Sequence, residues 1–231
     1  MNCMNALVSW SGGKDSCLAL WRAQQSGLKV TALLTALDET GLRTRSHGVS
    51  RHLIEAQAAA LGVAVHFISA TWADYEAQFT AALREAHADG ISVAVFGDID
   101  LLPHREWEEK VCAQAGLRAV LPLWDESRRA LVDEFWATGF AARVVCVDGR
   151  HLSAAFVGRA FDAAYVQSLP HGVDACGENG EFHTFVTDGP NFAKPVSWVS
   201  RGVHSVQAPA EFGGHTYHFD LLDSSAPEVV A

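Results

Sequence analysis

The strongest chemical signal in this sequence is a short polar loop that directly follows an apolar stretch. Ser11-Gly12-Gly13-Lys14-Asp15-Ser16 comes after Ala6-Leu7-Val8-Ser9-Trp10. Two glycines let the backbone approach an anion closely, and the N–H groups at a helix start attract phosphate. Lys14 adds a mobile cation, and Ser11 and Ser16 add hydroxyl donors. The sequence therefore predicts a phosphate-binding loop at the end of a strand, with a helix that opens at Ser16.

The spacing within this loop separates it from other phosphate-binding loops. The G-x-x-x-x-G-K-[ST] pattern of P-loop proteins is absent. A plain turn, in which Asp15 or Ser16 caps the helix, is the structural alternative. That alternative requires neither the second glycine nor Lys14, so we interpret the loop as a nucleotide-binding loop.

A second dense group of reactive side chains lies in the segment Cys176–Thr184, which reads Cys-Gly-Glu-Asn-Gly-Glu-Phe-His-Thr. Two carboxylates, an imidazole and a hydroxyl in so short a segment could bind Mg²⁺, orient an amine nucleophile or accept its proton. Cys176 has no base at a known catalytic spacing, so we interpret it as structural. The predicted catalytic residues are Lys14, Asp15, Glu178, Glu181 and His183.

A third polar group, Gly97-Asp98-Ile99-Asp100, follows another apolar run. Ligands of open parallel sheets bind beyond the carboxyl ends of the strands, so the aspartates could hold Mg²⁺, or they could cap the next helix. Arg105 could contact phosphate or belong to a solvated charged face. The predicted nucleotide-binding residues are Ser11, Gly12, Gly13, Lys14, Asp15, Ser16, Gly97, Asp98 and Arg105. The predicted metal ligands are Asp15 and Asp98.

A regular alternation of strand and helix patterns must position these groups. Buried-strand patterns occupy residues 6–10, 29–37, 63–69, 92–97 and 118–121. Helical patterns occupy residues 16–26, 50–61, 74–89 and 104–115. This alternation predicts an α/β fold, a Rossmann-like parallel sheet with helices on both faces. The polar segment 38–49 is expected to be a mobile loop.

The regular strand–helix alternation stops near residue 125. This change predicts two domains, residues 1–125 and residues 126–231. The second part shows helical patterns at 126–138 and 153–168, a strand at 141–147, and a glycine-rich segment at 172–190. Its last two alternating runs, 196–207 and 215–222, predict an antiparallel pair. The expected second domain is thus a smaller α/β domain with antiparallel strands.

Composition excludes several classes of protein. The formal net charge of −10 over 231 residues disfavours general nucleic-acid binding. No apolar run approaches the length of a membrane span, and the N-terminus lacks the pattern of a secretory signal, so we expect a cytoplasmic protein. The five cysteines contain no C-x-x-C pair, which disfavours a disulfide framework or an iron–sulfur site. A homodimer remains compatible with the sequence.

The loop at residues 11–16 resembles the PP-loop, S-G-G-x-D-S, of the ATP pyrophosphatases. Other motifs narrow the resemblance, above all G-E-x-G-E-F at residues 177–182. The remaining motifs are Gly97-Asp98-Ile99 with Arg105 and Glu108, Pro122-Leu123-Trp124, and Asp188-Gly189-Pro190. Over nearly the whole chain, the sequence is similar to the diphthine–ammonia ligase family of N-type ATP pyrophosphatases.

The resemblance implies an ATP-binding, adenine nucleotide alpha-hydrolase-like first domain and a second domain that binds the acceptor. It also implies the reaction: with ATP and Mg²⁺, the enzyme adenylates the carboxylate of diphthine on elongation factor two, and ammonia displaces AMP. Residues 11–16 are then expected to hold the phosphates, while Glu178 and Glu181 face the acceptor. The implied partners are a small-molecule or protein-borne carboxylate and ammonia.

Two departures from the family lie where the acceptor is expected. This chain has Asp98–His104 where relatives carry a small residue and Tyr-Gln, and it has His183 where they tend to have Glu. The departures favour a bacterial subgroup whose acceptor is diphthine or another carboxylate, for example a cobalamin-related one. A non-catalytic ATP-binding regulator and a base-thiolating enzyme are the rival functions.

Overall fold

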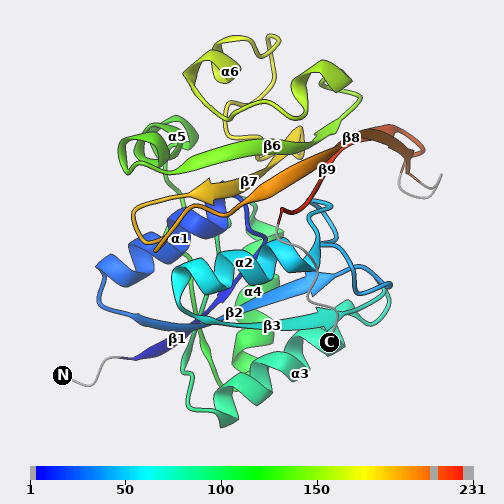
Figure 1. The fold of residues 1–231 in the computed structure, drawn as a ribbon. Helices are drawn as coiled ribbons and strands as arrows, with labels where there is room; N and C mark the ends of the chain where they lie inside the picture. Colours follow the sequence, from blue (N-terminus) through cyan, green and yellow to red (C-terminus); the bar gives the residue numbers. More distant parts are fainter. Residues whose placement is uncertain (1–3, 209–212, 226–231) are drawn as a thin grey trace.

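The fold contains two β-sheets with different strand directions (Figure 1). The computed structural model describes residues 4–208 and 213–225. The first sheet has five parallel strands in the order β3-β2-β1-β4-β5, and the second has four antiparallel strands in the order β7-β6-β9-β8. The predicted α/β class is therefore confirmed.

The elements around the parallel sheet follow the predicted alternation. Its strands are β1 (Asn5–Ser9), β2 (Lys29–Leu37), β3 (Ala64–Ser69), β4 (Val93–Val95) and β5 (Arg118–Val120). Its helices are α1 (Lys14–Gln25), α2 (Arg51–Leu61), α3 (Tyr75–Ala88) and α4 (Leu102–Ala115). The prediction that α1 opens at Ser16 is wrong by two residues, because Gly13 takes the extended N-cap conformation. Lys14, Asp15 and Ser16 consequently form the first turn of the helix.

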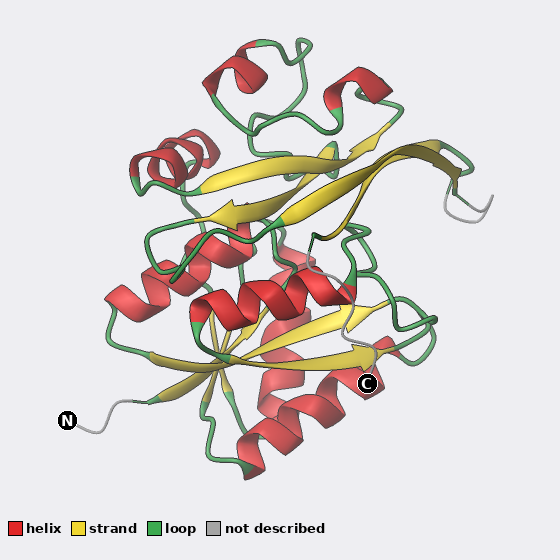
Figure 2. Cartoon of the chain, viewed as in Figure 1, coloured by secondary structure: helices red, strands yellow, loops and turns green. Residues whose placement is uncertain are grey.

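Both faces of the parallel sheet are buried, which explains its continuous apolar strands. In β1, Ala6 and Val8 join the core formed with α1 and α2, whereas Leu7 joins the core formed with α3 and α4. The first of these cores extends without a break into the second sheet. Figure 2 shows the reason: α1 and α2 lie between the two sheets, so each helix packs against both.

The second part of the chain contains the antiparallel sheet and three short helical segments. The strands are β6 (Ala141–Asp148), β7 (Phe182–Asp188), β8 (Trp198–Gln207) and β9 (Thr216–Ser224). The helical segments are α5 (Arg128–Ala137), the 3₁₀ turn Ala154–Phe156 and α6 (Ala163–Gln167). The predicted antiparallel pair of the two last runs is confirmed by β8 and β9. None of the described helices is both long and apolar enough to cross a bilayer.

One prediction for this part is wrong in detail, and one strand was not predicted. The helical stretch expected at 153–168 is broken, because Gly158 adopts a φ of 79° and the chain beside it pairs with β6. The glycine-rich segment 172–190 ends in a strand, since Phe182, Phe185 and Val186 enter the core. The segment 38–49 is a loop with two isolated bridges; its mobility stays a prediction.

The loop at residues 11–16 is fixed by both parts of the chain. The side chain of Gln57 on α2, which is fully buried, donates to the carbonyl oxygens of Gly12 at 3.0 Å and Val186 at 2.7 Å. It also accepts a hydrogen bond from Trp10 Nε1 at 2.9 Å. From β7, the Val186 amide donates to Gly12 O at 2.9 Å, and Thr184 Oγ1 accepts from the Lys14 amide at 3.0 Å. The second sheet therefore sets the position of the loop.

Replacing Gln57 by leucine should destabilise the protein strongly. The Gln57→Leu change keeps the volume but leaves the Trp10 indole N–H and the Val186 carbonyl buried without partners. We expect the free energy of unfolding to fall by about 2–4 kcal/mol, measured by urea denaturation. The control is Gln78→Leu on the exposed face of α3, where a change within about 0.5 kcal/mol is expected. Equal effects of the two substitutions would contradict this account of the loop.

Candidate active site

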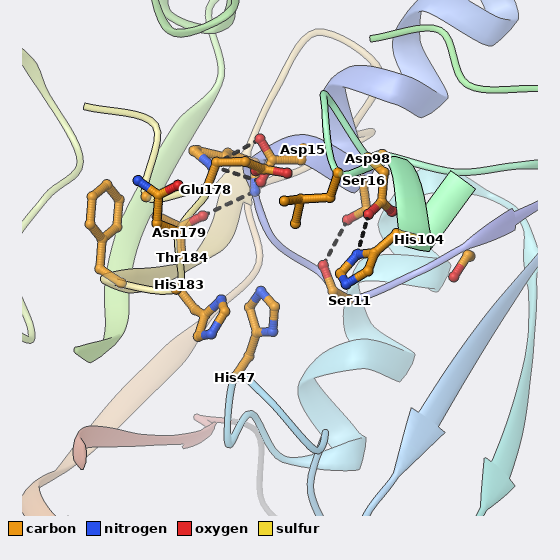
Figure 3. A pocket seen from close by; sticks show the side chains of 17 residues that line it. Ser11, Asp15, Ser16, His47, Asp98, His104, Glu178, Asn179, His183 and Thr184 are labelled. Carbon is orange, nitrogen blue, oxygen red and sulfur yellow. Dashed lines mark hydrogen bonds and ion pairs between the residues drawn. The ribbon is translucent and has the colours of Figure 1, made fainter. Parts of the chain in front are cut away.

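A cavity of about 510 Å³ opens above the loop, at the carboxyl ends of β1 and β4 (Figure 3). Its floor contains Ser11, Lys14, Asp15 and Ser16. Gly97 and Asp98 form one wall, and residues 177–180 and 182–184 of the second part form another. The structure thus brings together the three polar groups that the sequence singled out.

The glycines of the site serve close packing of the backbone. Gly12 has a φ of 79°, and a side chain there would place its Cβ only 2.6 Å from Gln57 Oε1. A Cβ on Gly97 would lie 2.9 Å from the carbonyl carbon of Asp15 and 3.0 Å from the amide nitrogen of Ser16. Gly97 is therefore required for the contact between the end of β4 and the first turn of α1.

The serines of the loop reinforce its shape. Ser11 Oγ accepts a hydrogen bond from the Gly13 amide at 3.2 Å, and Ser16 Oγ donates to the Gly13 carbonyl at 3.0 Å. The two hydroxyl oxygens lie 3.2 Å apart. Because α1 begins here, its N-terminus adds a partial positive charge to the floor of the cavity.

Lys14 and Asp15 form an ion pair at the floor. Lys14 Nζ lies 2.6 and 2.8 Å from the two carboxylate oxygens of Asp15, and the lysine is only 6% exposed. Burial lowers the pKa of Lys14, but Asp15, Cys176 and Glu178 outweigh it and leave the pKa above its ordinary value. The lysine consequently remains a cation, as phosphate binding requires.

Asp15, Cys176 and Glu178 form a tight group whose ligand atoms all lie within 4.8 Å of one another. Burial and the neighbouring Asp15 raise the pKa of Glu178 to about 7. Burial also raises the pKa of the Cys176 thiol to about 12, so this cysteine is protonated, as a structural residue is. The two carboxylates suit Mg²⁺, whereas the thiol does not.

Asp98, the other predicted metal ligand, lies outside that group. Its carboxylate contacts His104 Nδ1 at 2.7 Å and shares a hydrogen bond with the carboxyl group of Glu108. Glu108 is 4% exposed, and burial together with Asp98 raises its pKa to about 11. Burial opposes ionisation of Asp98, but His104 and Glu108 hold its pKa below the ordinary value. The pair therefore carries one negative charge on Asp98 and one proton on Glu108.

Four predicted site residues do not line the cavity: Gly12 and Gly13, which belong to the backbone of the loop, and Glu181 and Arg105. The Glu181 carboxylate points into its own loop, where it accepts hydrogen bonds from the backbone amides of Asp174 and Asn179. Arg105 pairs with Glu109 at 2.7 Å and stacks on the Trp124 ring. Neither Glu181 nor Arg105 lines the cavity, and their predicted roles in catalysis and nucleotide binding stay predictions.

Arg128 was not singled out by the sequence, yet it connects the segment after Gly97-Asp98 with the segment that carries Glu178, and both segments contribute to the cavity lining. Its guanidinium binds both carboxylate oxygens of Asp100 at 2.7 Å, Asp174 at 2.9 Å and Asn179 at 3.1 Å. Asp174 in turn accepts hydrogen bonds from the amides of Cys176 and Glu178. This chain of contacts holds Glu178 over the loop.

A second cavity of about 500 Å³ adjoins the first and was also missed. Its walls are rich in aromatic rings, namely those of Trp10, Trp72, Tyr75, Phe79, Phe96 and Trp107. The two cavities share Ser9, Ser11, His47, Asp98, His104 and His183. Together they form a site with a polar end on the loop and an aromatic end beside β2.

The fold and this site define a nucleotide-binding α/β protein of the PP-loop type. Two family models match the chain: the diphthamide synthase N-terminal domain over residues 4–119 and the diphthamide synthase C-terminal domain over residues 127–205. The chain belongs to the diphthamide synthase family. The family assignment and the enzyme class predicted from the sequence, an ATP-dependent ligase, are therefore confirmed.

Curated relatives agree with this assignment. A diphthine–ammonia ligase of Danio rerio is 29% identical, with 88% of this chain and 90% of that protein covered. The diphthine–ammonia ligases of Bos taurus and Homo sapiens are each 27% identical, with 86% of this chain and 85% of those proteins covered.

One solved structure matches the chain with lower sequence identity than these relatives. It is titled as a predicted subunit of tRNA methyltransferase from Methanocaldococcus jannaschii and is 18% identical, with a TM-score of 0.47. The match covers 81% of this chain and 98% of that one. At this similarity we draw no functional argument from it.

The raised pKa of Glu178 predicts a specific pH dependence of stability. The folded protein keeps a proton on Glu178 that the unfolded chain loses at lower pH, so this residue's contribution falls from about pH 5 to about pH 7 and then levels off. His183, with its pKa lowered to about 4 by burial, acts in the opposite direction at acidic pH. The difference between wild type and Glu178→Gln, measured by urea unfolding, isolates the Glu178 contribution. A difference that does not change with pH would contradict the assignment.

Proposed function

We propose that this ligase adenylates a carboxylate with ATP, releases pyrophosphate, and then transfers ammonia to the activated acyl group. The observation that carries the proposal is the placement of Glu178 and Asp15 over the same cavity as Lys14 and the N-terminus of α1. A phosphate-binding floor and a carboxylate with a pKa of about 7 thus face one reacting volume. The proposal rests further on the family membership.

The two cavities suit the two ends of ATP. The polar cavity offers Lys14, the serine hydroxyls and the helix terminus to the phosphates. The aromatic cavity offers ring faces to the adenine base, for instance from Tyr75 and Trp107. In this arrangement the α-phosphate lies between the cavities, and the pyrophosphate group lies on the loop.

In the first step, a carboxylate oxygen of the acceptor bonds to the α-phosphorus, and the bond from phosphorus to the pyrophosphate oxygen breaks. Lys14 and the N–H groups of α1 stabilise the charge that develops on pyrophosphate. Bound Mg²⁺ would neutralise phosphate charge, and the Asp15 carboxylate would hold it, which leaves Glu178 for the second step. Asp98 takes no part in the proposed metal site.

In the second step, the nitrogen of ammonia bonds to the acyl carbon, and the bond to the AMP oxygen breaks. The new amide nitrogen must lose a proton. Glu178 is the proposed acceptor, because a pKa of about 7 leaves a large ionised fraction at neutral pH.

The proposal also covers the identity of the acceptor and which part of the chain binds each substrate. Relatives named diphthine–ammonia ligase favour diphthine, whereas Asp98–His104 and His183 favour a different carboxylate. We assign ATP binding mainly to residues 1–125 and acceptor binding to residues 126–231, with Glu178, His183 and Thr184 of the second part lining the same cavity as the loop. The contribution of Thr184 and Val186 to the loop supports joint formation of the cleft.

The experiment that tests the function is an ATP–pyrophosphate exchange assay with a panel of carboxylates, followed by AMP formation on addition of ammonium. Diphthine-bearing elongation factor and cobalamin-related acids belong in the panel. ATP binding without exchange or AMP formation over the whole panel would favour the regulator. Full activity of Cys176→Ser would exclude thiolation through this cysteine.

Substitutions of Lys14 and Asp15 in the loop should abolish the reaction and leave the fold unchanged. We expect Lys14→Met and Asp15→Asn each to lower AMP formation by at least about a hundredfold, because both remove charge from the reacting volume. The control is Lys110→Met, which breaks only the half-exposed pair with Glu76. Circular dichroism checks the fold. Retained AMP formation in both loop variants would overturn the assignment of the loop.

A further inference from the structure

His47 and His183 meet at the junction of the two cavities. His47 comes from the loop between β2 and α2, and His183 comes from β7. Both side chains line both cavities. Their ring centroids are 4.5 Å apart and their planes are inclined by 38°. Figure 3 shows the two imidazoles side by side, brought together from two distant segments.

The ring nitrogens of this pair have no protein partner. Within residues 4–208 and 213–225, neither imidazole makes a hydrogen bond or an ion pair, whereas His104 across the site is bonded to Asp98. A Cβ on Gly13 would lie 2.8 Å from His47 Nε2, so this nitrogen reaches the backbone of the loop. Both residues are half-buried and line both cavities, so their ring nitrogens are accessible to a ligand bound there.

Electrostatics keeps the two rings uncharged in the free protein. Burial, followed by Lys14, lowers the pKa of His183 to about 4. Burial, His183 and Lys14 hold the pKa of His47 well below its ordinary value. A neutral imidazole still offers one N–H donor and one acceptor. An anion that pairs with Lys14 removes part of the repulsion and lets an imidazole take up a proton.

Other charged groups face the junction of the two cavities, and their charges affect how the protonation of His47 and His183 depends on pH. Lys14 and Asp15 face it from α1, and Glu178 faces it from the segment before β7. Asp98 lies on the opposite wall with its partner His104, where Glu108 also lines the aromatic cavity. Arg45 reaches the aromatic cavity from the same loop as His47.

We propose that His47 and His183 together bind the α-phosphate of the nucleotide, the group at which adenylation takes place. The inference rests on the proposed function, which puts the base in the aromatic cavity and pyrophosphate on the loop. The junction of the cavities is then the position of the α-phosphate. Hydrogen bonds at this position also stabilise the charge that the α-phosphate oxygens gain during attack, so the pair contributes to catalysis as well as binding.

The test compares two ligands, AMP and inorganic pyrophosphate, by isothermal titration calorimetry. His47→Leu and His183→Leu should each weaken AMP binding by about tenfold, the loss expected for one hydrogen bond to a charged group. Pyrophosphate binding should change by less than about twofold. Lys14→Met should show the reverse preference, and the exposed His204→Leu on β8 should alter neither affinity.

His47→Gln and His183→Gln serve as the conservative pair, because glutamine restores a donor. These variants should recover most of the lost AMP affinity. Unchanged AMP affinity in the leucine variants would overturn the inference. An equal loss of affinity for AMP and pyrophosphate would also overturn it, because it would mean that the histidines only stabilise the loop at residues 11–16. Wild-type protein that binds neither ligand would overturn the proposed function together with the inference.

A measurement on the wild type avoids any effect of substitution on folding. In histidine-labelled protein, AMP should shift the imidazole ¹H–¹⁵N resonances of His47 and His183, and pyrophosphate should shift them much less. Unmoved imidazole resonances at saturating AMP would refute the pair's role while leaving ATP binding by the loop intact.

Discussion

The backbone carbonyl of Gly12 is the point on which the site depends. It accepts hydrogen bonds from the side chain of Gln57 on α2 and from the amide of Val186 on β7, at 3.0 and 2.9 Å. Glycine adopts the positive φ of Gly12 without strain, so the conformation alone does not fix the loop, and these two hydrogen bonds do. One partner comes from each part of the chain. A phosphate-binding loop of the first sheet therefore has its native geometry only when the second sheet is docked.

The electrostatics of the site follow from the burial of several acids around one lysine. Asp15 is paired with Lys14, Asp98 is paired with His104, and Glu108 avoids a second charge by keeping its proton. Burial and the charge of Asp15 outweigh the effects of Lys14 and Arg128, which is why the pKa of Glu178 lies near 7. A buried acid without a full partner is a common mark of a catalytic group. The same arrangement leaves the lysine as the dominant cation for an incoming phosphate.

Sequence reasoning found the groups whose chemistry is local and missed those whose role is set by packing. The loop at residues 11–16 and Glu178 were found because glycines and reactive side chains lie together in the chain. Gln57 was missed because a lone glutamine in an alanine-rich helix has no distinguishing pattern. Glu108 lies in a run of charges that is typical of a solvated face, and only the tertiary structure shows that it is buried.

Glu181 belongs to a motif that suggests chemistry, and its carboxylate accepts hydrogen bonds from two backbone amides of a turn; its catalytic role stays a prediction. The strand at the end of the glycine-rich segment was missed. Its apolar residues, Phe182, Phe185 and Val186, follow polar residues and glycines that dominate the local composition. Pairing with β6 fixes this strand, and such pairing over a long separation leaves no local pattern.

The bridge made by Arg128 has a consequence for access to the site. Its partners Asp100 and Asp174 lie in the two chain segments that contribute Asp98 and Glu178 to the cavity, so any motion that separates these segments must break one set of charged hydrogen bonds. The guanidinium is about a quarter exposed, and dissolved ions weaken charge pairs that reach solvent. The contact that Arg128 makes between these segments therefore weakens as ionic strength rises. The salt concentration of the solution then becomes one of the factors that set how readily substrates enter and products leave.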